Sequence, residues 1–238
     1  MTVRWDKAQV DGKSMRVYTG VPDRPGPLPC VVVAQHGPGH DNTIQDVVQR
    51  LHREGYVAVA PELYHRQPKD VDPKISRVTL LKDNEVIADM NAALEHAKSV
   101  ATISRAGVTG FCMGGRVAYL MASANTEFKA SVVFYGGNTM KPWGDNQGPT
   151  PFERSKDIGC PVLGLFGAED TNPSPDDVRK IDTELTRLGK WHEFHTYQDT
   201  GHAFCNFLAA DRYRERVARA GWAELLAFFD LYLKQGKA

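Results

Sequence analysis

The chain has no excess of charge of either sign and few cysteines. Both features reduce the number of functions that the protein could have. Its 238 residues include 29 Lys and Arg against 29 Asp and Glu, so the formal net charge at pH 7 is zero. This balance argues against nucleic acid or an anionic membrane surface as the main partner. The four cysteines, at positions 30, 112, 160 and 205, show no C-x-x-C spacing, which is typical of reduced thiols in a cytoplasmic protein.

Long apolar runs are also absent. No segment approaches the about 18 consecutive apolar residues that a membrane-spanning helix needs. The first residues, MTVRWDKAQV, lack the apolar stretch of a secretory signal, so we expect a cytoplasmic protein without membrane contact. A chain of this length buries roughly 70–75% of its unfolded surface, which is enough for one core without disulfides. We expect residues 1–238 to form a single domain, either as a monomer or as a homodimer.

Short Val-rich segments recur along the chain. They lie at residues 30–34, 56–60, 106–111, 131–135 and 161–166. Continuous apolar runs of this length are typical of strands that are buried on both faces of a parallel sheet. Helical spacing of apolar residues predicts helices over residues 44–51, 86–97 and 178–188, and a last helix near residues 207–234. The alternation predicts an α/β fold with a mostly parallel sheet flanked by helices.

The remaining segments predict a hairpin at one edge of the sheet and two long connections between elements. The first 20 residues are typical of a β-hairpin on one edge of the sheet. Residues 65–82 and 137–159 are long connections, which in a compact domain often form lids or substrate walls. For the second connection, a purely surface role is equally compatible with its sequence.

The most specific motif is Gly110-Phe111-Cys112-Met113-Gly114-Gly115, which follows one predicted strand and opens a helix at residues 116–124. It matches the G-x-nucleophile-x-G elbow, with cysteine in the place of serine. Such a turn crowds the positions two residues away from the nucleophile, and glycine removes the side chains there. The helix N-terminus favours thiolate over thiol, and the Met113 N–H becomes one donor of an oxyanion hole. The alternative is a buried structural cysteine in a glycine-rich turn.

A cysteine nucleophile needs a base and a group that orients the base, and in this topology the acid precedes the histidine. Asp170 closes the predicted strand PVLGLF, at the strand end where catalytic groups gather. Glu169 and Asp199 are alternatives to it. His202 lies in the segment TGHAF before the last helix, from which it can reach the elbow. We therefore predict Cys112, Asp170 and His202 as the catalytic residues.

These motifs together resemble the dienelactone hydrolase family (carboxymethylenebutenolidase-like) of the α/β-hydrolase superfamily. The resemblance rests on AQHG, APELYHRQ, GFCMGGR, GAED and GHAF, and it covers almost the whole chain. It implies a single α/β-hydrolase domain with no large cap. It also implies an enzyme that hydrolyses enol-lactones or other small carboxylic esters with no metal or organic cofactor. Carried over by position, the second oxyanion N–H comes from Gly37.

Two positions depart from the family pattern. His36 stands where dienelactone hydrolases have Glu, and Asn206 stands where they have an Arg that clamps a substrate carboxylate. Because Asn has no charge, we expect neutral esters to compete well with carboxylate-bearing lactones, and Asn206→Arg to restore a preference for anions. The residues predicted to contact substrate are His36, Tyr64, Arg77, Phe111 and Asn206, with Trp143 as a weaker candidate.

Three other interpretations use the same residues. Cys112 and Cys205 could form a thiol redox or peroxidatic pair, although a small apolar filler is the simpler role for Cys205. The fold could also be a binding scaffold without activity, which the intact set of catalytic residues argues against. His192 and His195 resemble a zinc pair with His202, but on a strand these two would point to opposite faces, so we expect no metal.

Overall fold

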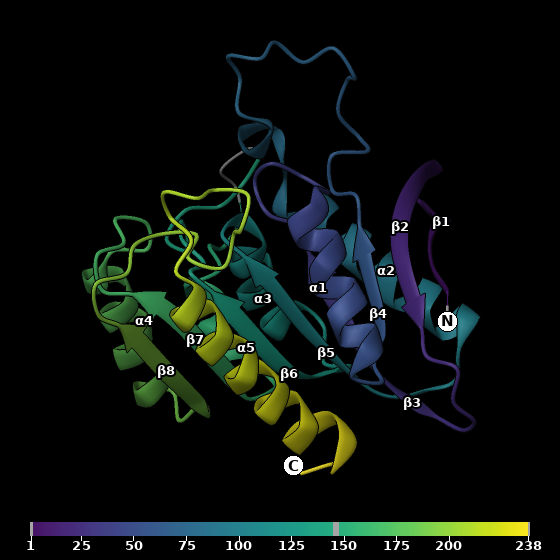
Figure 1. Ribbon diagram of the computed structural model, residues 1–238. Helices are drawn as coiled ribbons and strands as arrows, with labels where there is room; N and C mark the ends of the chain where they lie inside the picture. Colours follow the sequence, from purple (N-terminus) through teal and green to yellow (C-terminus); the bar gives the residue numbers. More distant parts are fainter. Residues whose placement is uncertain (1, 145–147, 238) are drawn as a thin grey trace.

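A central β-sheet organises the structure, a computed structural model that describes residues 2–144 and 148–237. Within these ranges the sheet has eight strands: β1 (Thr2–Val10), β2 (Lys13–Val21), β3 (Leu28–Ala34), β4 (Val57–Pro61), β5 (Ile103–Phe111), β6 (Phe128–Phe134), β7 (Val162–Gly167) and β8 (His192–Tyr197). Their order is β1-β2-β4-β3-β5-β6-β7-β8 (Figure 1). All five predicted Val-rich strands are confirmed.

The direction of the strands follows the prediction as well. From β4 through β3 to β8, all neighbours are parallel, whereas β1 and β2 form an antiparallel hairpin that joins the edge at β4. The hairpin turns at Asp11 and Gly12, whose φ angles are 49° and 73°. Positive φ at both positions suits the right-handed twist of the two strands. The fold is therefore mostly parallel α/β with an N-terminal hairpin at one edge.

Helices cover both faces of this sheet. They are α1 (Asn42–Arg53), α2 (Asp83–Val100), α3 (Met113–Ala124), α4 (Pro175–Arg187) and α5 (Glu215–Phe229), with a π-helical turn at Asp230–Lys234 and 3₁₀ turns η1 (Arg77–Leu80) and η2 (Glu153–Asp157). Helices α1 and α5 lie on the front face in Figure 1, and α2, α3 and α4 pack on the other. Each face has its own apolar core, so the sheet is covered on both sides.

The last helix begins later than the sequence predicts. It starts at Glu215 rather than near residue 207, because the preceding segment folds into turns. The Asn206 side chain accepts a hydrogen bond from the Leu208 N–H at 3.0 Å, and the Arg214 N–H donates to the Phe204 carbonyl at 3.1 Å. Phe207 and Leu208, which extended the apolar pattern, are 42% and 52% exposed, so no packing supports a helix there.

The two long connections lie beyond the carboxyl ends of the strands. Residues 65–82 carry η1 and project above the sheet in Figure 1. The connection at 137–159 carries η2, and its residues 145–147 lie outside the described ranges. The elbow helix α3 starts directly at Met113 rather than at residue 116, so it begins on the residue after Cys112.

Close backbone contacts hold the elbow between β5, β3 and α3. A Cβ atom on Gly110 would lie 2.1 Å from the Gly114 carbonyl oxygen, and one on Gly114 would lie 2.3 Å from the Ala34 carbonyl oxygen. Both obstacles are backbone atoms that cannot turn aside. The crowding that the motif predicts at these two glycines is therefore present.

We expect Gly110→Ala to lower the free energy of unfolding by more than about 3 kcal/mol, the upper part of the range for overpacked interiors. Gly159→Ala is the matched control, because its Cβ would meet only the Thr126 methyl at 4.0 Å. That variant should stay within about 0.5 kcal/mol of the parent. Urea unfolding of both variants makes the comparison. Equal stabilities would show that the elbow relaxes without cost.

Candidate active site

Cys112 occupies a backbone conformation that few residues adopt. Its φ of 57° and ψ of −116° place it at the sharp turn between β5 and α3. Its N–H donates to the Phe134 carbonyl at 3.0 Å, and its carbonyl accepts from the Gly115 N–H at 3.0 Å. A residue held this way costs about 1–3 kcal/mol and persists only where its surroundings enforce it. The side chain is thereby presented at the carboxyl edge of the sheet.

Three groups act on the Cys112 sulfur. They are the backbone N–H groups of Met113 and Gly37 and the His202 imidazole, and each of them lowers the pKa of the thiol. Burial alone raises the pKa of the thiol. The bond and charge of His202, together with the two N–H groups, outweigh burial and bring the pKa below its ordinary value. The site therefore favours a thiolate.

His202 is held in turn by Asp170. The His202 Nδ1 lies 2.8 Å from the Asp170 Oδ2, and the ring packs edge-on against Tyr135 at 5.1 Å between centroids. Asp170 is 3% exposed, and its other oxygen accepts from the Asn172 N–H at 2.8 Å. Burial lowers the pKa of His202, but the bonds to Asp170 and Cys112 raise it to about 9. The imidazole therefore remains protonated beside the sulfur at neutral pH.

The two other carboxylates that the sequence offered lie elsewhere. Glu169 and Asp199 are both exposed. Neither carboxylate forms a hydrogen bond or ion pair with His202 in the described part of the chain, and the Glu169 N–H donates to the Thr200 carbonyl at 2.9 Å. Among the residues that the structure describes, Asp170 is the carboxylate that contacts His202.

A cavity of about 280 Å³ opens in front of Cys112. It is lined by Ser76, Val78, Thr79, Cys112, Met113, Arg116, Gly137, Asn138, Trp143, Asn172 and His202. Both long connections contribute to this wall, the first through residues 76–79 and the second through residues 137–143. Of these, the sequence predicts Cys112, Met113, His202 and Trp143 as site residues. It misses Arg116, which follows the elbow glycines, and six others: Ser76, Val78, Thr79, Gly137, Asn138 and Asn172. Those six belong to no motif, and their only signal is a position in the loops that follow strands.

Arg116 fixes the second part of this wall. It is fully buried and forms two hydrogen bonds to Asp83, at 2.6 and 3.1 Å. It also donates to the carbonyls of Asn138 and Lys141 at 3.0 and 2.6 Å, and its guanidinium lies 3.8 Å from the Trp143 ring centroid. Its charge is thus already neutralised by Asp83, although it is the one Arg or Lys among the described residues of the lining.

Two residues predicted to contact substrate, His36 and Arg77, lie outside this lining. The His36 Nε2 is 2.8 Å from Asp41, and burial lowers its pKa despite that neighbour. Arg77 donates to the Pro68 and Lys69 carbonyls, both at 3.2 Å. Their side chains are engaged within their own segments and do not face Cys112.

Asn206 requires a correction of the specificity argument. Its side-chain oxygen accepts from the Thr43 hydroxyl at 3.0 Å, and it does not line the cavity in front of Cys112. It fastens the turn after His202 to the start of α1. The expectation that Asn206→Arg places a cation against the substrate is therefore wrong for this geometry.

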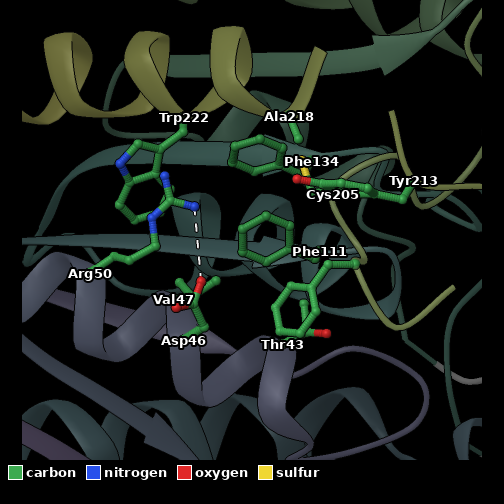
Figure 2. Close-up of a pocket in the computed structure, with 11 residues that line it drawn as sticks. Thr43, Asp46, Val47, Arg50, Phe111, Phe134, Cys205, Tyr213, Ala218 and Trp222 are labelled. Atoms are coloured by element: carbon green, nitrogen blue, oxygen red, sulfur yellow. Dashed lines mark ion pairs between the residues drawn. The ribbon is translucent and has the colours of Figure 1, made fainter. Parts of the chain in front are cut away.

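Tyr64 and Phe111 also lie outside the lining. The Tyr64 hydroxyl donates to the Gly37 carbonyl at 2.6 Å. Phe111 stacks on Phe134 at 4.4 Å and faces a different cavity of about 280 Å³, between α1 and α5 (Figure 2). Cys205 lines that second cavity, where it is hydrogen-bonded to Tyr135, and burial raises the pKa of its thiol. Nothing in this arrangement favours Cys205 as a redox partner of Cys112.

The histidines of the apparent zinc pair have separate partners. The His192 Nε2 lies 3.1 Å from Asp182, whereas the His195 Nε2 lies 2.7 Å from Glu193. In residues 2–144 and 148–237, no group of three His, Cys, Asp or Glu side chains is arranged to hold a metal ion. Over the same ranges, no helix has the length and apolar character needed to cross a membrane.

Comparison with known proteins agrees with the fold and identifies the family. The sequence model of the Dienelactone hydrolase family matches residues 15–233. The "Putative carboxymethylenebutenolidase" of Escherichia coli (strain K12) is 34% identical over 232 residues, covering 93% of this chain and 84% of that protein. The "Probable 2-oxo-3-(5-oxofuran-2-ylidene)propanoate lactonase" of Bradyrhizobium sp is 27% identical over 238 residues, covering 96% of this chain and 94% of that protein. A crystal structure of a "Putative Dienelactone Hydrolase" from Klebsiella pneumoniae subsp. pneumoniae MGH 78578 has a TM-score of 0.88 at 32% identity, covering 98% of this chain and 100% of that one. The chain therefore belongs to the dienelactone hydrolase family, with the α/β-hydrolase fold.

Proposed function

We propose that the protein hydrolyses carboxylic esters or enol-lactones through Cys112, His202 and Asp170. The observation that carries the proposal is that Cys112 shares one cavity with His202, which Asp170 holds at 2.8 Å, while the N–H groups of Met113 and Gly37 favour its thiolate. A base and two oxyanion donors at one nucleophile are what acyl transfer requires. The names of the relatives, a carboxymethylenebutenolidase and a lactonase, support the same substrate class.

In the first half of the reaction, the Cys112 thiolate attacks the carbonyl carbon of the ester. The carbonyl oxygen becomes an oxyanion, which the Met113 and Gly37 N–H groups stabilise. When the carbon–oxygen bond to the alcohol breaks, protonated His202 donates its proton to the leaving oxygen. Asp170 keeps the imidazole oriented and stabilises its positive charge. The product of this half is a thioester between Cys112 and the acyl group.

In the second half, neutral His202 takes a proton from water, and the resulting hydroxide attacks the thioester carbon. A second oxyanion forms in the same hole and collapses when the carbon–sulfur bond breaks. The acid product leaves, and the thiolate and imidazolium are restored. Amides are poor substrates for this site, because the thiolate leaves the tetrahedral intermediate more easily than an amine does.

Removal of the nucleophile should abolish turnover. We expect Cys112→Ala to lower kcat for a neutral p-nitrophenyl ester by on the order of 10³-fold or more, and His202→Ala to match it, since triad members act as a unit. Asp170→Asn should cost less than either. Cys160→Ala is the control, because this buried thiol lies away from the cavity. Near-parental hydrolysis by Cys112→Ala would disprove the proposal.

The ion pair should appear in the pH dependence of thiol alkylation. Because the pKa of Cys112 is lowered from 9.0, its reaction with iodoacetamide should reach half its plateau below pH 9. In His202→Gln, burial prevails, and the midpoint should move above that of the parent. Cys30 and Cys160, whose pKa burial raises to about 12, should remain unmodified and serve as internal controls. An unchanged midpoint in His202→Gln would contradict the pairing.

The charge of the substrate should matter little in the parent protein, since Arg116 is already paired with Asp83. We expect similar kcat/KM values for a matched pair of neutral and carboxylate-bearing esters. Thr79→Lys adds an unpaired cation to the cavity wall and should raise the anionic-to-neutral ratio by about tenfold, as charged hydrogen bonds are roughly twice as strong as neutral ones. Asn206→Arg is the matched control outside the lining and should leave the ratio unchanged. If Asn206→Arg alone raised the anionic-to-neutral ratio, position 206 would after all be the one that binds the substrate carboxylate.

A further inference from the structure

Tyr64 contacts both residues that form the oxyanion hole. Its hydroxyl donates to the Gly37 carbonyl at 2.6 Å and lies 3.3 Å from the Met113 sulfur. The side chain is 7% exposed and lies behind the hole, outside the cavity lining. We propose that Tyr64 is a positioning residue, whose hydroxyl holds the Gly37 N–H in the direction that an oxyanion requires. This inference rests on the proposed function.

Gly37 benefits from such a restraint because it has no side chain of its own to hold it. It follows β3 in the sequence His36-Gly37-Pro38-Gly39, where Pro38 restricts the chain on one side but the φ of Gly37 is left free. The turn is closed by one hydrogen bond, from the Gly39 N–H to the His36 carbonyl at 2.9 Å. The Gly37 N–H and carbonyl lie on either side of one Cα atom. A short bond to the carbonyl therefore limits the rotation that would turn the N–H away from the sulfur.

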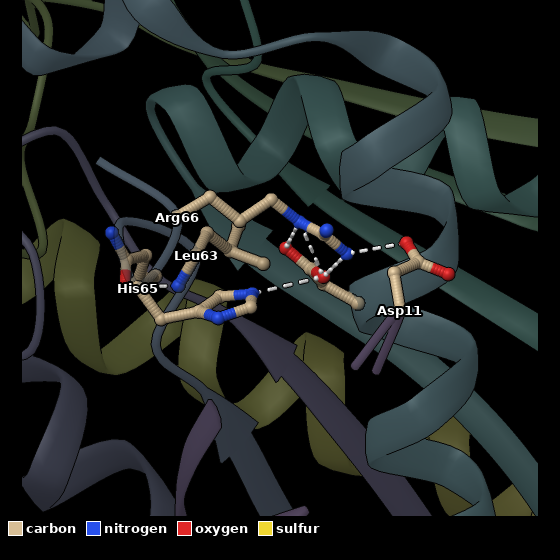
Figure 3. Close-up of polar contacts among 6 residues, drawn as sticks. Asp11, Leu63, His65 and Arg66 are labelled. Atoms are coloured by element: carbon tan, nitrogen blue, oxygen red, sulfur yellow. Dashed lines mark hydrogen bonds and ion pairs between the residues drawn. The ribbon is translucent and has the colours of Figure 1, made fainter. Parts of the chain in front are cut away.

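The residues before and after Tyr64 are held by polar contacts, of which Figure 3 shows those of Leu63 and Arg66. Before it, the Leu63 N–H donates to the Gln35 side chain at 3.1 Å, which ties it to the end of β3. After it, Arg66 binds Asp89 of α2 at 2.6 Å and Asp11 of the hairpin at 2.9 Å. Because the backbone on both sides of Tyr64 is held, its hydroxyl can in turn hold the Gly37 carbonyl in place. Donors that are held in position before the reaction stabilise an oxyanion best.

The hydroxyl also keeps its proton throughout the working pH range. Burial, and then the negative charge of the nearby Cys112 thiolate, raise the pKa of Tyr64 to about 12. It therefore remains a neutral donor while Cys112 and His202 change charge. Since the oxyanion forms in both halves of the reaction, loss of this donor should lower kcat whichever half limits the rate. KM should change little, because Tyr64 does not touch the cavity.

The test is Tyr64→Phe, which removes one oxygen and keeps the ring. We expect kcat for p-nitrophenyl acetate to fall by about tenfold with KM within about twofold, less than the 10²–10³-fold loss of an oxyanion donor itself. Tyr119→Phe is the matched control. It removes another buried tyrosine hydroxyl, which is 2.6 Å from Ser155 and away from the cavity, and its kcat should equal the parental value.

Two further measurements separate positioning from folding. Rates are divided by the Cys112 thiol that iodoacetamide alkylates at a pH well below that at which an ordinary thiol ionises. Unfolded chains, which lack the lowered pKa of Cys112, react slowly there and are not counted. The plateau rate of alkylation, a reaction without an oxyanion, should be unchanged in Tyr64→Phe. If Cys112→Ala is inactive, the proposed function stands. In that case a parental kcat in Tyr64→Phe, or an equal loss of kcat in Tyr119→Phe, would overturn the inference about Tyr64. Full activity in Cys112→Ala would instead overturn the proposed function.

Discussion

The close packing of backbone at the elbow is the constraint on which the rest of the site depends. Gly110 and Gly114 bring β5, α3 and the end of β3 within distances that no side chain permits. This packing forces Cys112 into its positive φ and places the Gly37 segment beside it. The strain is local, and the two apolar cores on either face of the sheet sustain it. A thiolate with two backbone donors follows from this arrangement of main-chain atoms.

Electrostatic balance then decides the charge of the three groups that we propose as catalytic. Burial opposes charge on both Cys112 and His202, yet each supplies the opposite charge that the other needs. Asp170 adds a second negative partner from the floor of the site, where it is shielded from water. The cost of removing charges from water is offset only because all three groups lie within hydrogen-bond reach. Exposure of any one of them would weaken the whole set.

The sequence predicted what depends on short-range rules and missed what depends on side-chain direction. The buried strands, the hairpin and the elbow follow from apolar runs and glycine spacing, and Asp170 and His202 follow from chain order. Arg77 and Asn206 were assigned by position in a family pattern, but their side chains bond to their own surroundings. The wall at Ser76, Thr79 and Asn172 carries no periodicity or motif. Its position follows from how three loops fold against one another, which local patterns do not encode.

Two parts of the site, the cavity wall and the segment around Tyr64, are both bonded to helix α2. Asp83, at the first turn of α2, holds Arg116 and the segment beside Trp143, whereas Asp89 of the same helix holds Arg66 next to Tyr64. Six residues along a helix correspond to about 9 Å of its axis, a spacing that loops cannot alter. Helix α2 thus fixes the distance between the cavity wall at Arg116 and Trp143 and the segment at Tyr64 that supports the proposed oxyanion hole. Residues that face the substrate can consequently diverge, through loop substitutions alone, without disturbing the distance on which the chemistry depends.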